Sequence, residues 1–75
     1  MTEEKQQIAN RIAEIISTAR KRKGYSCYEI AKRTGIHTSQ IMRIESGENI
    51  PRVDTLMKIC RSLTIQIKLP DLIRI

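Results

Sequence analysis

The sequence has few residues of several types, and each shortage excludes a class of protein. Its 75 residues contain three glycines, two prolines and two cysteines, and two tyrosines are the only residues among Phe, Tyr and Trp. Cys27 and Cys60 are too few for a disulfide framework or a four-ligand zinc site, so reduced thiols are expected. No apolar run is long enough for a membrane and no signal-peptide pattern is present, which predicts a cytoplasmic protein.

Groups that would support catalysis are also missing from the sequence. It has no paired carboxylates, no nucleophile beside a base and no glycine-rich phosphate loop, so we expect neither enzyme activity nor a cofactor. His37 is the only histidine. A single histidine without further ligands cannot form a metal site, so we interpret His37 as a polar residue at a helix start rather than a metal ligand or pH switch.

Apolar residues recur at helical spacing in the first third of the chain. Ile8, Ile12, Ile15 and Ala19 are four, three and four residues apart, which predicts an amphipathic helix that ends near Lys23. Residues 1–5 are polar, and we expect them to be frayed. A chain of this length forms one domain with a small core, so oligomerisation is expected to add stability.

Residues 26–47 carry the signals of two short helices joined by a turn. Ser26 can cap the first helix, and Glu29 three residues later completes a capping box. Gly35 ends this helix because glycine tolerates the left-handed conformation found after helix C-termini. Ile41 and Ile44 give the second helix an inner face, which leaves its polar residues and Met42 on or near the outer side.

The positive charge of the chain is concentrated around these two helices. The formal net charge is +6, and residues 20–43 contain seven Lys or Arg residues against the single acid Glu29. A basic run alone is usually a solvated surface, but beside two such helices it favours the binding of phosphates.

The last third of the chain changes its period. Helical spacing predicts a packing helix over residues 53–62, with Cys60 as a small buried apolar residue. Leucine and isoleucine then alternate with polar residues, which predicts one β-strand with a buried face, ended by Pro70. The inward row of this strand is Leu63, Ile65, Ile67 and Leu69.

Taken in order, the motifs resemble the Cro and phage-repressor type of helix-turn-helix, also called xenobiotic-response-element-like. The matching residues are Ser26, Glu29, Ile30, Ala31, Gly35, Ile36, Ser39, Ile41, Arg43, Ile44, Glu45, Gly47, Pro51, Thr55, Leu56 and Leu63. The resemblance implies a mainly all-α, lambda-repressor-like bundle of about four helices over residues 1–63. It also implies that double-stranded DNA is the partner. The first helix begins earlier than is usual in the family, so its extra turn could cover a partner subunit.

The resemblance also implies roles for individual residues. Those expected to read bases are His37, Thr38, Ser39 and Arg43, with Arg43 the strongest candidate because a guanidinium matches guanine O6 and N7. Those expected to contact the DNA backbone are Lys23, Ser26, Cys27, Tyr28, Asn49 and Arg52. A glutamine that grips phosphate is common in the family where this chain has Cys27, so more of that contact would fall to Ser26 or Tyr28. Arg20 and Glu45 match a buried structural ion pair.

The C-terminal residues suggest how the protein assembles. Residues 64–75 contain the one predicted strand, and the chain offers no second strand to pair with it, so we expect an antiparallel pairing between two subunits. The result would be a homodimeric repressor that reads an inverted repeat. The alternative at this stage is an antitoxin-type module that binds a protein toxin and regulates its own operon.

Overall fold

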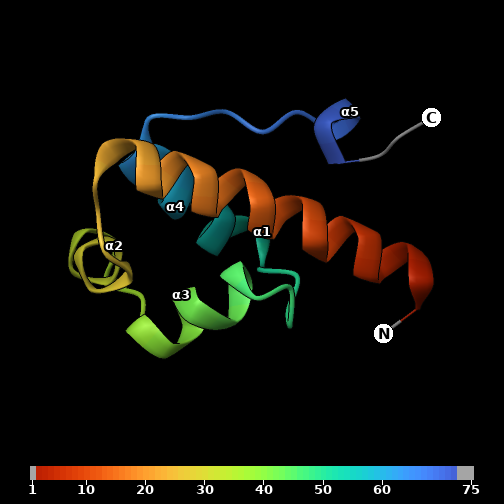
Figure 1. Cartoon of the computed structure of the whole chain (residues 1–75), viewed down its shortest axis with the longest axis horizontal. Helices are drawn as coiled ribbons and strands as arrows, with labels where there is room; N and C mark the ends of the chain where they lie inside the picture. Colours follow the sequence, from red (N-terminus) through yellow and green to blue (C-terminus); the bar gives the residue numbers. More distant parts are fainter. Residues whose placement is uncertain (1, 73–75) are drawn as a thin grey trace.

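The computed structural model describes residues 2–72, and the elements found there are all helices (Figure 1). They are α1 (Glu3–Lys23), α2 (Cys27–Thr34), α3 (Thr38–Glu45), α4 (Val53–Leu63) and α5 (Leu69–Leu72). The long helix α1 lies across the shorter helices, with α3 on one side of it and the C-terminal segment on the other. The predicted helical bundle is therefore confirmed.

Helix α1 begins inside the segment that was expected to be frayed. Thr2 caps it by accepting a hydrogen bond from the Lys5 N–H at 3.2 Å, and the helical backbone starts at Glu3. The prediction that residues 1–5 are frayed is thus wrong for residues 3–5, while Met1 lies outside the described residues. The helix ends where Gly24 takes φ = 75°, a left-handed conformation that a residue with a side chain adopts at a cost.

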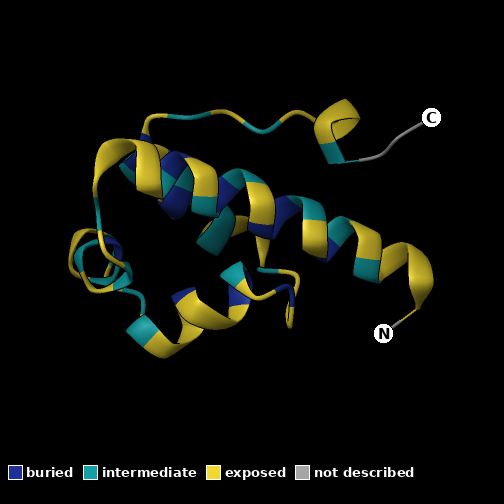
Figure 2. Ribbon diagram, viewed as in Figure 1, coloured by how far each residue is buried: buried dark blue, intermediate teal, exposed yellow. Residues whose placement is uncertain are grey.

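The core is a single cluster of aliphatic side chains from four helices. Its largest fully buried members are Ile12, Ile16, Ile30, Ile41, Ile44, Ile59 and Leu63. On α1 the buried residues fall on one side of the helix, which packs against α3 and α4 (Figure 2). Burial of these side chains holds α2 and α3 against α1, because Ile30 of α2 and Ile41 and Ile44 of α3 belong to the same cluster.

The strand predicted over residues 63–69 is wrong at both of its ends. Leu63 is the last residue of α4, and its side chain is only 1% exposed because it follows the buried Ile59 by four positions on the same helix face. Leu69 begins α5. Pro70 therefore lies inside the first turn of a helix, where its fixed φ is tolerated, instead of ending a strand.

Residues 65–68 keep one feature of the predicted strand. Ile65 and Ile67 are half-buried, whereas Gln66 and Lys68 are exposed, which is the expected two-residue alternation. No strand pairs with them within residues 2–72. The reversal of the chain before this segment is made by Thr64, the only non-glycine residue with positive φ among the described residues.

The C-terminal segment folds back onto α1 of its own subunit. Arg11 Nε donates a hydrogen bond of 2.7 Å to the Asp71 carbonyl, and Ile65 and Leu72 pack against the core cluster. The Asp71 carboxylate in turn accepts a hydrogen bond from the Lys68 N–H at 3.0 Å, which helps α5 to begin.

The early turns of α1 also contact their own subunit. Gln6 Nε2 donates a hydrogen bond of 3.0 Å to the carbonyl of Gly47, which follows Ser46, the C-cap residue of α3. A side-chain carbon added at Gly47 would lie 2.6 Å from Asn10 Oδ1, so the loop fits closely against α1. The early turns of α1 thus hold the loop after α3 in the same chain, and the expectation that the extra turn covers a partner stays a prediction.

Candidate nucleic-acid interface

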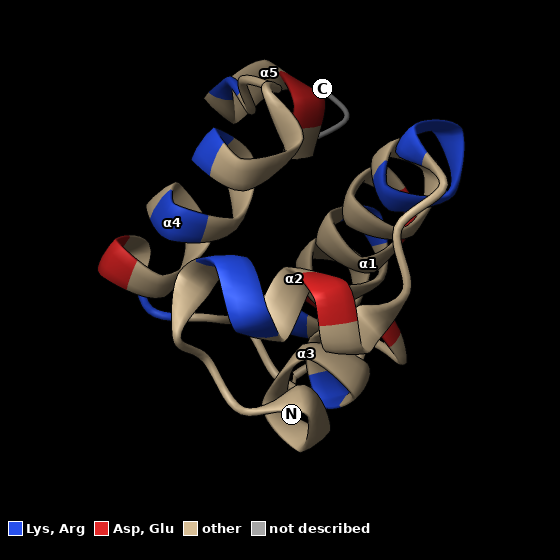
Figure 3. Cartoon of the chain, turned by 90° about the vertical axis from the view of Figure 1, so that its left-hand side faces the viewer, with Lys and Arg blue, Asp and Glu red and all other residues tan. Residues whose placement is uncertain are grey.

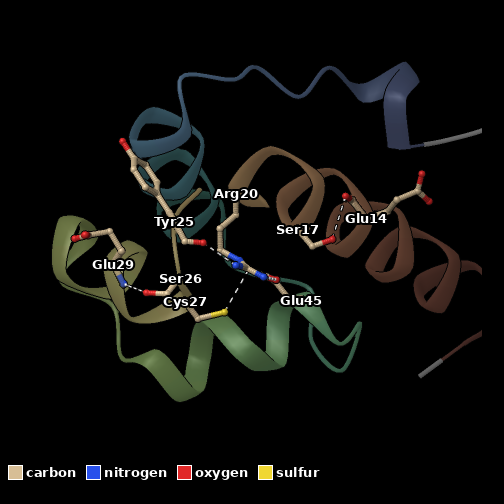
Figure 4. Close-up of polar contacts among 8 residues, drawn as sticks. All are labelled: Glu14, Ser17, Arg20, Tyr25, Ser26, Cys27, Glu29 and Glu45. Atoms are coloured by element: carbon tan, nitrogen blue, oxygen red, sulfur yellow. Dashed lines mark hydrogen bonds and ion pairs between the residues drawn. The ribbon is translucent and has the colours of Figure 1, made fainter. Parts of the chain in front are cut away.

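Helices α2 and α3 are joined in the way the sequence predicts. Ser26 Oγ accepts a hydrogen bond from the Glu29 N–H at 3.0 Å, which caps α2 (Figure 4). The other half of a capping box is not made, because the Glu29 carboxylate instead lies 3.9 Å from Arg33 Nε one turn later. Gly35 ends α2 with φ = 77°, and α3 begins after three residues. The predicted helix-turn-helix geometry is present.

An ion pair fixes the end of α3 to the end of α1. Arg20 Nε lies 2.7 Å from Glu45 Oε2, and Arg20 Nη2 lies 3.0 Å from Oε1, so the two groups meet through paired hydrogen bonds (Figure 4). Arg20 Nη1 also donates to the Tyr25 carbonyl at 2.7 Å. The side chains are only 15% and 10% exposed. The expected Arg20–Glu45 pair is formed, and it couples α1, the loop before α2 and α3.

The thiol of Cys27 belongs to this same cluster. Its Sγ lies 3.6 Å from Glu45 Oε2, with the thiol as donor (Figure 4). Partial burial, together with the negative charge of Glu45, raises the pKa of Cys27 above its usual value. The thiol donates to Glu45 and adds to the ion pair, so the expected contact of Cys27 with the DNA backbone would have to use its backbone N–H.

The outer side of α3 carries the expected base-reading residues. Ser39 and Arg43 are exposed, Thr38 is half-buried, and His37 is the exposed N-cap residue without a side-chain capping bond. Within residues 2–72, Arg43 has no carboxylate close enough to form an ion pair. Ile41 and Ile44 occupy the opposite side and are buried. The four residues therefore lie together at the start and along the outer side of one short helix.

The expected backbone-contacting residues lie on three separate segments. Lys23 is exposed at the end of α1, and Tyr28 is exposed in the first turn of α2, with Lys32 Nζ 5.6 Å from its ring centre. Asn49 and Arg52 are exposed in the loop between α3 and α4. Arg52 also forms a surface ion pair of 3.4 Å with Asp54.

The positive charge is unevenly distributed over the surface. Figure 3 shows Lys and Arg residues at the end of α1, on α2 and on α4, with few acids between them. Two of the seven basic residues in the 20–43 segment are engaged, because Arg20 pairs with Glu45 and Arg33 lies near Glu29. The remaining basic side chains give this part of the molecule its positive field.

Two features of the site were missed by the sequence-based reasoning. Gln6, which holds the loop after α3, is 41 residues away from Gly47 in the chain, and no local pattern marks such a contact. Met42 is the other, because its position on the outer side of α3 was recognised but no role was given to it. Its side chain is 58% exposed on a helix whose other aliphatic residues, Ile41 and Ile44, are buried.

Two other kinds of site are absent from the described residues. Within residues 2–72, no three His, Cys, Asp or Glu side chains are grouped so that they could hold a metal ion. None of the helices in this part of the chain has the length and apolar character needed to cross a membrane.

Comparison with known proteins adds one match to this geometry. The sequence model of a family described as helix-turn-helix matches residues 16–68, which include α2, α3 and α4 and most of the chain. No curated protein and no solved structure gives a match. The matched region begins inside α1, so the N-terminal turns that contact Gly47 lie outside it.

Proposed function

This chain belongs to the Cro/C1-type helix-turn-helix family of DNA-binding transcription regulators, and we propose that it is a dimeric repressor that reads an inverted repeat through the major groove. One observation carries the proposal: α3 is fixed on its inner side and unengaged on its outer side. Ile41 and Ile44 anchor it in the core, and the Arg20–Glu45 pair holds its end. Such a rigid helix can enter the groove without rearrangement.

The residues on the outer side of α3 have the chemistry for base recognition. Arg43 offers two parallel N–H donors to guanine O6 and N7, a pairing that fixes the base identity. Thr38 and Ser39 exchange hydrogen bonds with several bases, so they add less discrimination. His37, at the start of the helix, is in position to contact a base or phosphate near the groove edge.

Contacts to the DNA backbone would orient α3 in the groove. The backbone N–H groups of Cys27 and Tyr28, in the first turn of α2, have no acceptor within residues 2–72. Helix N-termini bind phosphates through such unpaired N–H groups. Ser26 and the Tyr28 hydroxyl lie at the same end of α2. Lys23 on one side, with Asn49 and Arg52 on the other, would extend the contact along the strand.

The proposal is tested by selecting bound sequences from a random DNA pool and comparing two variants on the selected site. Arg43→Ala should lower affinity for that site by about 1–3 kcal/mol and barely change binding to random duplex. Arg52→Ala is the matched control, because loss of a phosphate contact should weaken both duplexes alike. Failure to enrich any sequence would contradict sequence-specific binding.

An apolar groove supports assembly into a dimer. It lies between α4 and residues 65–72, has a volume of about 650 Å³, and is bordered by Val53, Met57 and Leu69, which are 74%, 56% and 74% exposed. The N–H groups of Gln66 and Ile67 have no acceptor within residues 2–72. A second copy would cover the groove and pair with residues 65–68 along their free edge.

The dimer is tested by the solution mass at tens of micromolar. Met57→Lys introduces a charge into the groove and should give a monomer, whereas Met42→Lys, at nearly the same exposure on α3, should leave the mass unchanged. Ile67→Pro removes an N–H that the single subunit does not use, and it should loosen the dimer without altering the helices. A monomeric full chain would contradict the dimer.

The same groove supports a second candidate function, an antitoxin-type module. Exposed apolar side chains at Val53, Met57 and Leu69 would suit a toxin protein as well as a second copy. In that case the chain alone should be monomeric, and Met57→Lys should abolish binding of the protein encoded beside it. DNA binding through α3 would then serve to regulate the shared operon.

A further inference from the structure

Met42 is one of three exposed large apolar residues among those described that do not border the groove proposed as the dimer interface; Tyr28 and Ile50 are the other two. Val53, Met57 and Leu69 border the groove between α4 and the C-terminal segment. Met42 instead lies on α3, and it is not part of the lining of this groove. Its exposure of 58% is therefore not explained by the groove.

Helix geometry assigns Met42 to the surface that carries the polar base-reading candidates. Residues three or four positions apart on a helix are surface neighbours, so Met42 lies beside Thr38 and Ser39. Arg43 follows it directly and is exposed on the same outer half of the helix. The core contacts of α3 are made by Ile41 and Ile44, so Met42 contributes little apolar burial to the folded subunit.

The chemistry of the side chain limits what it can recognise in DNA. A thioether donates no hydrogen bond and accepts only weakly, so it cannot bind a phosphate or replace the pairing of Arg43 with guanine. In the major groove the distinctive apolar group is the C5-methyl of thymine. Methionine suits such a contact because its flexible, polarizable chain adapts to irregular surfaces.

We propose that Met42 is a specificity-determining residue that contacts a thymine C5-methyl group in each half-site. The proposal rests on the function proposed above, since it requires α3 to lie in the major groove. It assigns a thymine to one position of the operator, beside the bases reached by Ser39 and Arg43. A single exposed methionine between polar neighbours is too small a patch to form a protein interface on its own.

The experiment uses the full chain and a duplex carrying the site selected from a random pool. Each thymine is replaced in turn by deoxyuridine, which removes the methyl group and leaves the base pair intact. At one position of a half-site we expect about fourfold weaker binding, which corresponds to about 0.8 kcal/mol for one buried carbon group. Met42→Ala should weaken binding to the thymine duplex and abolish the difference between thymine and deoxyuridine.

Two further variants separate this contact from a general loss of binding. Met42→Leu keeps an apolar side chain and should retain a preference for thymine. Met57→Ala removes a methionine of similar exposure on α4, and it should keep the whole deoxyuridine penalty whatever it does to total affinity. Because Met42 is exposed and alanine favours helix, Met42→Ala should fold normally.

Two results would overturn the inference while leaving the proposed function intact. One is a selected site at which no thymine-to-deoxyuridine change weakens binding. The other is a penalty of equal size in the wild-type chain and in Met42→Ala, which would assign the methyl contact to another residue. If no sequence were selected at all, the proposed function itself would fail.

Discussion

Residues 26–47 and residues 64–72 are both short stretches with clear local patterns, yet they are held in different ways. The first contains its own signals, the cap at Ser26 and the turn at Gly35, and its apolar residues reach the core through α2 and α3. The second has alternating burial but no strand partner among the described residues. Its position depends on a contact with Arg11, which is 60 residues away from Asp71 in the chain.

The two regions show that a sequence carries separate information on side-chain burial and on backbone hydrogen bonds. Periodicity predicts which side chains face inward, and it does so correctly in residues 26–47. In the second region it holds for Ile65 and Ile67 but is wrong for Leu69, which was expected to face inward and is 74% exposed. Periodicity does not decide where backbone hydrogen bonds go, because a helix satisfies them locally and a strand requires another strand. Mutations that remove local or distant contacts should therefore affect the two regions to different extents.

The largest effect is expected from the ion pair that fixes α3. Glu45→Ala leaves the guanidinium of Arg20 largely buried without its ion-pair partner, so the free energy of unfolding should fall by about 3–5 kcal/mol. Urea denaturation measures this change. Glu48→Ala, an exposed neighbour, should change it by less than about 0.5 kcal/mol. Equally small effects of Glu45→Ala and Glu48→Ala would mean that the ion pair does not hold α3 to α1.

A pair of leucines tests the C-terminal region in the same way. Leu63→Ala removes a core side chain at the end of α4 and should cost about 2–5 kcal/mol, whereas Leu69→Ala, at 74% exposure, should cost less than about 0.5 kcal/mol. The measurement is thermal unfolding at a concentration below dimerisation. Comparable costs at both positions would favour the uninterrupted strand predicted from the sequence.

The next test removes the single hydrogen bond by which Ser26 caps α2. Ser26→Ala leaves the Glu29 N–H without its acceptor, so stability should fall by about 1 kcal/mol. Ser39→Ala provides the control, because Ser39 is exposed on α3 and should matter for DNA and not for folding. Equal effects of Ser26→Ala and Ser39→Ala on unfolding would mean that this hydrogen bond does not stabilise the start of α2.

The smallest effect is expected from the contact that holds α5. Arg11→Ala removes the donor to the Asp71 carbonyl and should lower global stability by about 0.5 kcal/mol. Hydrogen exchange at the Asp71 amide, which donates to the Lys68 carbonyl, should accelerate several-fold. Glu14→Ala removes only the exposed ion-pair partner of Arg11 and should leave this exchange rate unchanged. Unchanged exchange in Arg11→Ala would contradict the role of this contact.

Much of the fold followed from the sequence because its signals are local. Apolar spacing located α1 and α4, and Ser26 with Gly35 located α2. The end of α4 was different, since Thr64 takes a positive φ that is unfavourable for a β-branched residue and that no local rule predicts. The short helix α5 was missed because the alternating pattern of residues 63–69 extends into it.

The candidate site, like the fold, could be predicted only in part from the sequence. Side-chain chemistry and helix periodicity identified the outer side of α3, and family resemblance identified the partners Arg20 and Glu45, which are 25 residues apart. The direction of the Cys27 thiol could not be deduced, because it depends on where Glu45 lies in the folded chain. The roles assigned to individual residues on DNA remain predictions for the experiments above.

The hydrogen bond from Gln6 to the carbonyl of Gly47 has a consequence for how this protein can evolve. Gln6 recognises a backbone atom, so the contact is indifferent to the side chains on the outer side of α3. Substitutions at Ser39, Met42 or Arg43 would leave it in place. If α3 reads DNA as proposed, operator preference can change, or be redesigned, while this hydrogen bond continues to hold the loop after α3.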